Sequence, residues 1–234
     1  MLKPETSASP RSEATRAALV RAGLDLIGAK GFEATSTREI AAAANANIAS
    51  IAYHFRGKEG LRLACADFVA ATISDIFARA LGDPAEIERL EPAEARDRLA
   101  LIAEAMIDAI VARDAARPIA RFVLREMFEP SAAFDRLFKA GFAPMHAAAC
   151  GLWSRAAGSA AESETTRLAV FAMIAQIVYF RLARPAVLLR MTWRDIGASE
   201  AAAIKRLVVG NLDAAIDLAR KSDTCSSKRS ARSR

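Results

Sequence analysis

The stretch TREIAAAANANIASIAYHF, residues 37 to 55, joins two short helical segments through a very tight break. Ala41 and Ala44 are small, as residues must be where another helix comes close. Asn45 follows where the chain has to turn. Such a turn needs a left-handed backbone, which glycine adopts most readily and asparagine next most readily. Asn47 can cap the second helix. The spacing therefore predicts a helix-turn-helix, whose two helices are held together by Ile40, Ala46 and Ile51.

The rest of the chain has helical periodicity and no strand-like alternation, so we predict an all-α fold. Helices are expected over residues 15–30, 40–44, 48–55, 58–81, 93–112, 119–128, 134–158 with a bend near Pro144, 162–184 and 201–219. The predicted organisation is a three-helix helix-turn-helix domain over residues 12–60, a helical-bundle domain over 61–220 and a disordered basic tail over 221–234.

The net charge of +6 is concentrated at the end of the chain. From Arg220 onwards there are six Lys or Arg residues and one Asp, a net charge of +5. Such a tail either strengthens DNA binding without sequence preference or only increases solubility. Residues 1–60 carry eight Lys or Arg and six Asp or Glu, so the helix-turn-helix region itself is nearly neutral.

The second helix of the motif presents candidate DNA contacts if it lies in a major groove. Its first residues would face base edges. The next turn and the start of the following helix would face phosphates. Arg38, in the preceding helix, can make a bidentate contact with guanine. The expected base contacts are Arg38, Asn47, Ile48, Ala49 and Ser50, and the expected phosphate contacts are Tyr53, His54 and Lys58.

The segment TREIAAAANANIASIAYHFRGKEGL, residues 37–61, closely resembles the DNA-binding domain of TetR-family transcriptional regulators. The positions that match the family pattern are Thr37, Ile40, Ala41, Ala44, Ile51, His54, Phe55, Lys58 and Leu61. On this match Thr37 joins the expected DNA contacts. A second stretch, RFVLREMFEPSAAFDRLF at residues 121–138, resembles the C-terminal domain of the CecR-type subfamily.

The resemblance implies a homodimer that binds a pseudo-palindromic double-stranded operator and a small-molecule effector. Three positions depart from the family pattern: Asn45 replaces a glycine, Asn47 a serine and Ala52 a tyrosine that commonly contacts DNA. The two asparagines are physically adequate, and Tyr53 can take over part of the missing tyrosine's role. The expected function is a ligand-responsive regulator, most simply a repressor. One alternative is a helical interaction protein with a degenerate helix-turn-helix.

Polar and large side chains within the apolar helices of the C-terminal domain are candidates for an effector pocket. For Arg125, an ion pair with Glu129 is the alternative. For Gln176, the alternative is a satisfied core amide. Met106 and Trp153 are candidates by size alone. The expected ligand-binding residues are Met106, Arg121, Phe122, Arg125, Trp153, Gln176 and Tyr179.

Other classes of site leave no signature in the sequence. The two histidines, His54 and His146, are isolated, so no metal site is expected, and no catalytic motif or cofactor motif is present. We therefore expect neither an enzyme nor a bound cofactor. Cys65 and Cys150 are expected to be buried apolar residues, with thiol-based redox sensing as the alternative function.

The apolar run from Leu168 to Phe180 constrains both localisation and assembly. It is shorter than the ~20 residues that a bilayer requires, and no signal peptide is visible, so a cytoplasmic protein without membrane contact is expected. The run is apolar on every face, which a surface helix of a monomer does not sustain. Together with residues 201–219 it predicts a four-helix dimer interface.

Overall fold

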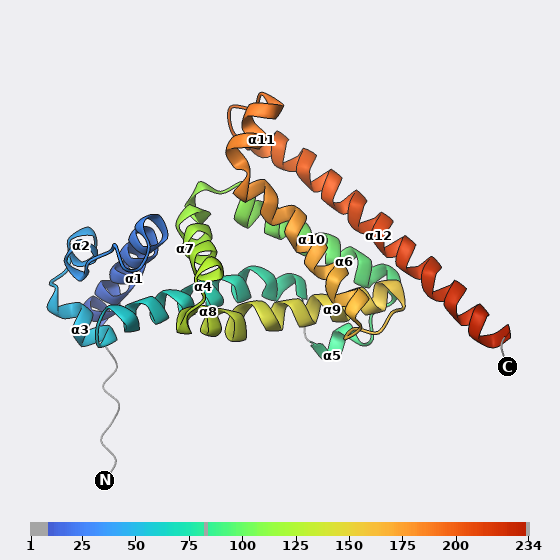
Figure 1. Cartoon of the computed structure of the whole chain (residues 1–234), viewed down its shortest axis with the longest axis horizontal. Helices are drawn as coiled ribbons and strands as arrows, with labels where there is room; N and C mark the ends of the chain where they lie inside the picture. The colour runs from blue at the N-terminus through green and yellow to red at the C-terminus, as the bar shows by residue number, and fades with distance from the viewer. Residues whose placement is uncertain (1–8, 82–83, 233–234) are drawn as a thin grey trace, which may run out of the picture. The chain divides into compact units, whose positions relative to one another are not determined.

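The computed structural model describes residues 9–81 and 84–232, and every regular element in these ranges is helical (Figure 1). The predicted all-α fold is confirmed. The chain divides into two compact units. The first unit comprises the residues up to Thr72 together with Arg117–Gly141. The second unit comprises Ile73–Ala116 together with the residues from Phe142 onwards.

The first unit is built from two segments that are distant in the sequence. Its N-terminal segment contains α1 (Pro10–Lys30), α2 (Thr37–Ala43), α3 (Ala49–Phe55) and most of α4 (Lys58–Leu81). Its second segment contains α7 (Arg117–Phe128), α8 (Ala132–Leu137) and most of the π-helical turn η3 (Phe138–Phe142). Its fully buried large side chains are Leu19, Ile27, Ile40, Ile51, Leu61, Phe122 and Leu137.

Helix α7 belongs to the first unit because it packs closely on α1. A Cβ atom at Gly28 would lie 3.1 Å from the backbone nitrogen of Phe122 and 3.2 Å from the carbonyl oxygen of Pro118. These contacts are tighter than an ordinary van der Waals contact, so a side chain at this position would push against the backbone of α7, whereas glycine lets the two backbones approach freely. The compact units therefore divide the chain differently from the predicted boundary at residue 60, since α7 and α8 pack with the helix-turn-helix segment.

The second unit is a helical bundle with one contiguous core. Its elements are the end of α4, α5 (Pro84–Ile87), α6 (Pro92–Met106), η1 (Ile107–Val111), η2 (Asp114–Ala116), α9 (Ala143–Ala157), α10 (Glu164–Leu182), α11 (Arg184–Met191) and α12 (Ala198–Arg232). Residues spaced at helical intervals point inward from each long helix, among them Leu99, Ile102, Leu152, Trp153, Ile177, Val208 and Leu212.

Helix α10 has one buried face and one exposed face. Val170, Met173 and Ile177 contribute to the core of the second unit. On the opposite side Leu168, Phe171 and Tyr179 are each more than half exposed. The prediction that one face of this helix meets its own domain is therefore confirmed, and the other face is apolar and uncovered in the single chain.

Two regions differ from the sequence-based prediction in their helix boundaries. The segment predicted as one bent helix over residues 134–158 consists of α8, η3 and α9, and Pro144 lies in the first turn of α9, where its missing N–H is not needed. Helix α12 continues to Arg232 and so covers most of the tail that was predicted to be disordered (Figure 1). After Gly210 no glycine or proline interrupts this helix.

We expect Gly28→Val to destabilise the first unit by about 1–3 kcal/mol, because the added side chain forces α7 away from α1. Urea unfolding followed by circular dichroism measures the change. Ala17→Val is the matched control, since it adds the same valine branches at an exposed position of α1. Equal stability of the two variants would contradict the close packing at Gly28.

Candidate functional site

The start of α2 is fixed by a capping box. The Ser36 hydroxyl accepts a hydrogen bond from the Glu39 backbone N–H at 3.2 Å, and the Glu39 carboxylate accepts one from the Ser36 N–H at 2.8 Å. Lys30, the last residue of α1, donates to the same carboxylate at 2.6 Å. The hydrogen bond from Lys30, followed by those from Ser36, lowers the pKa of Glu39 to about 2. The capping interaction is therefore fully formed at neutral pH.

The turn between α2 and α3 has the geometry that the sequence predicts. Asn45 has a φ of +49°, in the left-handed region. The Ala46 N–H donates to the Ala41 carbonyl at 2.9 Å, which closes the C-terminal end of α2. Ile40, Ala41 and Ile51 are buried, and Ala46 is half-buried. A helix-turn-helix is therefore formed, and Asn45 is a working substitute for glycine in it.

Asn47 caps α3 as predicted. Its side-chain oxygen accepts a hydrogen bond from the Ala49 N–H at 2.9 Å. The beginning of α3 is presented to solvent, since Asn47, Ile48 and Ala49 are exposed and Ser50 is half-buried. The opposite face of the helix is buried through Ile51 and Phe55.

The end of α3 carries a ring cluster on its exposed side. Tyr53 is 80% exposed, while His54 is half-buried. The His54 ring centroid lies 4.9 Å from that of Tyr53 and 5.9 Å from that of Phe55. On α2, Arg38 is exposed and Thr37 is half-buried. The first unit therefore holds all nine predicted DNA contacts, on α2, on α3 and at the start of α4.

The junction between α3 and α4 depends on a glycine that the sequence analysis did not single out. A Cβ atom at Gly60 would lie 1.7 Å from the carbonyl oxygen of Phe55, so only glycine fits there. Arg56 and Gly57 both have positive φ and reverse the chain direction between the helices. Lys58 follows directly, and its ammonium nitrogen lies 4.2 Å from the centre of the Phe32 ring.

The seven predicted ligand-binding residues are divided between the two compact units. Arg121, Phe122 and Arg125 lie on α7 in the first unit, where Phe122 is buried in the core. Arg125 donates to the carbonyl oxygens of Gly28 and Ala29 at 3.1 and 3.0 Å, and its guanidinium caps the C-terminal end of α1. These contacts replace the ion pair with Glu129 that the sequence offered as an alternative.

The other four lie in the second unit, two in its core and two on α10. Met106 and Trp153 are 2% and 3% exposed and fill its core. Gln176, on α10, accepts a hydrogen bond from the Asn211 side chain of α12 at 3.1 Å. Tyr179 is 61% exposed. Helical spacing identifies which residues share a helix face, but it cannot identify which faces enclose a common space.

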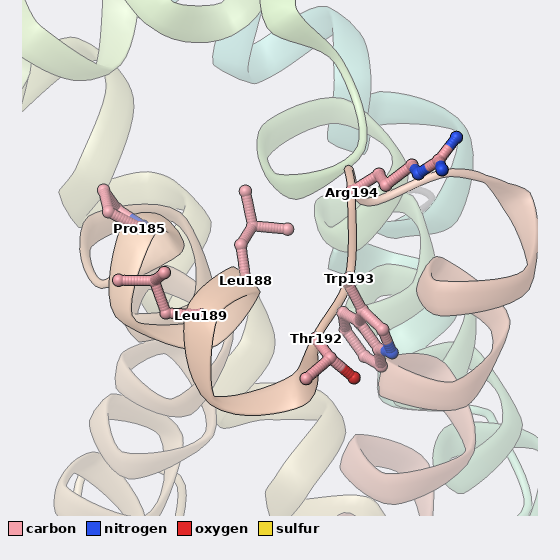
Figure 2. A pocket seen from close by; sticks show the side chains of 6 residues that line it. All are labelled: Pro185, Leu188, Leu189, Thr192, Trp193 and Arg194. Carbon is pink, nitrogen blue, oxygen red and sulfur yellow. The ribbon is translucent and has the colours of Figure 1, made fainter.

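An open groove lies along α11 and the loop that follows it (Figure 2). Its volume is about 550 Å³. Figure 2 shows that its lining is mostly apolar, with the Arg194 guanidinium directed away from the leucines. The groove does not include any of the predicted ligand-binding residues, since its lining consists of Pro185, Leu188, Leu189, Thr192, Trp193 and Arg194.

The described thiols are poor candidates for redox sensing. Cys65 and Cys150 are both fully buried. Burial, with a smaller contribution from Glu126, raises the pKa of Cys65 to about 12. Burial is also the main cause that raises the pKa of Cys150 to about 11. Both groups are therefore thiols at neutral pH, and thiols are far less reactive than thiolates. The structure disfavours the thiol-based alternative for these two residues.

The His146 side chain is held by contacts within the second unit. Its Nε2 lies 3.3 Å from the Arg167 carbonyl oxygen, its Nδ1 lies 3.6 Å from the Cys150 sulfur, and its ring centroid lies 4.1 Å from that of Phe171. Within residues 9–81 and 84–232, no group of three His, Cys, Asp or Glu residues is arranged to hold a metal ion.

Two family models match the chain over both parts of the molecule. The model for bacterial regulatory proteins of the TetR family matches residues 19–65. The model for the C-terminal domain of the HTH-type transcriptional dual regulator CecR matches residues 95–217. The chain is also 32% identical over 209 residues to the HTH-type transcriptional dual regulator CecR of Shigella flexneri, covering 87% of this chain and 92% of the relative.

The chain belongs to the TetR family. Within this family it is of the CecR type, and it is a DNA-binding transcriptional regulator. Membership in the TetR family and the intact turn at Asn45 disfavour the alternative of an interaction protein with a degenerate helix-turn-helix. Its relatives are transcriptional regulators, which as a class are generally not enzymes.

Solved structures of other regulators share the TetR-family fold. A putative transcriptional regulator from Pseudomonas aeruginosa PAO1 has a TM-score of 0.65 at 19% identity, covering 92% of this chain and 94% of that one. AibR, solved in complex with isovaleryl coenzyme A and operator DNA, has a TM-score of 0.61 at 16% identity, covering 84% of this chain and 96% of that one.

Among the described residues, α10 is the one helix that is long and apolar enough to cross a membrane by length and composition. In the TetR-family fold, however, Val170, Met173 and Ile177 of this helix pack in the core of the second unit. Its apolar character is therefore explained by its inner face together with the uncovered stripe on its outer face.

We expect Cys65 and Cys150 to react slowly with Ellman's reagent at pH 8. The test uses Cys225→Ser, because this substitution leaves Cys65 and Cys150 as the two thiols of the chain. In this variant the native thiols should react at least about a hundredfold more slowly than the same thiols in urea, since few are ionised and both are buried. A native thiol that reacts as fast as free cysteine would restore the redox alternative.

Proposed function

We propose that this TetR-family regulator is a repressor that binds a pseudo-palindromic operator as a homodimer and releases it when a small molecule binds the second unit. The observation that carries the proposal is the exposed start of α3. Ile48 and Ala49 are exposed there although both are apolar, while Ile51 and Phe55 on the other face are buried. A helix that presents its first turn in this way is suited to a major groove.

The expected contacts divide into two kinds. Arg38, Ser50 and the first turn of α3 read base edges, with Ile48 and Ala49 against thymine methyl groups. Tyr53, His54, Lys58 and the free N–H groups at the start of α4 contact phosphates and set the register on the duplex. Asn47 is occupied as the cap of α3, so its side-chain oxygen is not available to a base while this bond lasts. Its side-chain amide donors remain available.

The dimer interface follows from an apolar stripe on α10 and α12. Leu168, Phe171, Tyr179 and Leu182 are exposed on α10, and Leu207 and Leu218 are exposed on α12. The hydrogen bond between Gln176 and Asn211 places the two exposed faces side by side. Exposed apolar side chains gathered on neighbouring helices are typical of a protein interface. A second copy can cover it by forming a four-helix arrangement about a two-fold axis.

The response to an effector requires only a change in the separation of the two recognition helices. Half-sites lie about one helical turn, ~34 Å, apart, so a dimer that changes this spacing cannot contact both at once. A coupling of ~1–3 kcal/mol between effector and operator is sufficient for a measurable switch. The structure of AibR in complex with isovaleryl coenzyme A and operator DNA supports the proposal that a protein of this fold binds both a small molecule and an operator. A regulator that binds operator DNA acts in the cytoplasm, so a cytoplasmic location belongs to this proposal.

The DNA contacts are tested by comparing Lys58→Ala with Arg38→Ala. Lys58→Ala should weaken binding to all duplexes alike and reduce the salt dependence of log K by about one unit of slope, because one phosphate contact is lost. Arg38→Ala should weaken binding to an operator selected from a random DNA pool by about 1–3 kcal/mol more than binding to random DNA. Fluorescence anisotropy at several salt concentrations measures both.

The matched control for these variants is Arg190→Ala, which removes an exposed cation from α11 in the second unit. It should bind both kinds of DNA as the unmodified protein does. If Arg38→Ala loses the same factor on operator and on random DNA, Arg38 does not read a base.

The dimer is tested by placing a charge on the apolar stripe, at Leu207 of α12 and at Ala172, an exposed residue of α10 that follows Phe171 directly. Ala172→Glu and Leu207→Glu should raise the dimer dissociation constant at least about a hundredfold, because the carboxylate would be desolvated without a partner. Sedimentation at micromolar concentration measures the change. Leu101→Glu is the matched control, since Leu101 is 56% exposed on α6, away from the stripe. Val208 is unsuitable because it is fully buried, so a charge there would test folding. Two stripe variants that remain dimeric would exclude this interface.

A further inference from the structure

The CecR-type stretch on α7 and α8 contains a buried carboxylate that the DNA contacts do not explain. Glu126 is 1% exposed. The Arg62 guanidinium of α4 donates to it twice, from Nε to Oε1 at 2.7 Å and from Nη2 to Oε2 at 3.1 Å. The Ser131 hydroxyl, at the N-cap of α8, donates to Oε2 at 2.6 Å. The carboxylate is thus satisfied, and it holds Arg62 in one orientation.

The Arg62 guanidinium also lies against an aromatic ring. Its central carbon is 4.5 Å from the centre of the Phe32 ring, and the Lys58 ammonium is 4.2 Å from the same ring centre. Lys58 and Arg62 are four residues apart on α4 and therefore share one face of the helix. Phe32 is thus in contact with both cations, and each is attracted to the ring by a cation–π interaction.

Two cations on one ring repel each other unless one of them is neutralised. Glu126 supplies that neutralisation for Arg62, which is 13% exposed. Lys58 is then the cation at the ring whose charge is left for a partner outside the protein. Glu59 lies 4.0 Å from Arg62 as well, but it is half-exposed and in a high-dielectric setting.

The ring itself is placed by the neighbouring residue of α7. Arg125 donates to the last carbonyls of α1 at Gly28 and Ala29, and Gly31 and Phe32 follow directly. Two adjacent residues of α7 therefore hold the ring and the cation that contacts it. Arg125 fixes the end of α1 just before Phe32, and Glu126 fixes Arg62 against the Phe32 ring.

We propose that Glu126 is a positioning residue for DNA binding, which places the Lys58 ammonium through Arg62 and Phe32. This inference rests on the proposed phosphate contact of Lys58. Loss of the Glu126 charge leaves two unneutralised cations at one ring, and their repulsion displaces the Lys58 ammonium from its fixed position. The CecR-type stretch thereby takes part in DNA binding without touching DNA.

The test is a double-mutant cycle between Glu126→Gln and Lys58→Ala in the full-length protein. Glu126→Gln should lower affinity about tenfold for operator and random DNA alike and reduce the salt slope by about one, as Lys58→Ala does. Because both variants remove the same contact, the double variant should bind no more weakly than Lys58→Ala. Losses that simply add would overturn the proposal.

A spectroscopic signature separates positioning from stability. In the unmodified protein the Phe32 ring current shifts the ε-methylene protons of Lys58 upfield in the NMR spectrum, and Glu126→Gln should abolish this shift. Asp67→Asn is the matched control: it breaks another ion pair of α4, between Asp67 and Arg136 at 3.2 Å, at the protein surface. It should leave the shift and the affinity unchanged. The same loss in both variants would overturn the proposal.

Folding is controlled by a second variant, since a buried arginine without its partner is costly. Arg62→Met with Glu126→Leu replaces the pair by apolar side chains, which keeps the unit folded. In this variant no second cation repels Lys58, so it should keep the Lys58 shift and bind DNA as the unmodified protein does. A loss of affinity equal to that of Glu126→Gln would overturn the proposal. If Lys58→Ala binds DNA normally, the phosphate contact of Lys58 is wrong and the role of Glu126 falls with it. If Lys58→Ala is weakened and Glu126→Gln is not, only the role of Glu126 is wrong.

Discussion

The close approach of α1 and α7 at Gly28 is the constraint on which the first unit depends. A side chain at this position would meet the backbone of α7 at 3.1–3.2 Å, so the absence of one lets the two helices pack. Once α7 lies there, Arg125 reaches the end of α1 and Glu126 reaches Arg62 of α4. The close packing at Gly28 thus brings together two segments that are about 100 residues apart in the sequence, and it completes the unit that carries the helix-turn-helix.

Placement of charge matters more in this unit than its amount. The helix-turn-helix region is nearly neutral. Several cations of the first unit are already engaged within the protein. Lys30 is bound to Glu39, Arg62 to Glu126 and Arg125 to backbone carbonyls. Arg38 remains exposed on α2, the helix that precedes the uncovered start of α3. The chain therefore combines a small number of placed cations with a basic C-terminal segment that carries nearly all the net charge.

Local sequence patterns predicted the elements and the motif well, because these depend on neighbours in the chain. The left-handed turn at Asn45, the cap at Asn47 and the exposed first turn of α3 all follow from residues within a few positions of one another. For the effector residues, local patterns leave the choice between roles open. Arg125 is as suitable for a pocket as for a helix cap, and only the position of Gly28, 97 residues earlier, decides between them. Glu126 was missed because its partner on α4 is 64 residues away.

The exposure of the first turn of α3 has a consequence for how such a regulator changes its target. Ile48 and Ala49 do not contribute to the core, whereas Gly60 and Ile51 are fixed by the packing beneath them. Substitutions at the two exposed positions leave the folding free energy almost untouched, because surface positions generally contribute little to it. Neighbouring residues thus serve different purposes: the exposed ones contribute to DNA recognition and the packed ones to the stability of the fold. A lineage carrying this scaffold can acquire a new operator in single steps, without first accumulating compensating changes in the core.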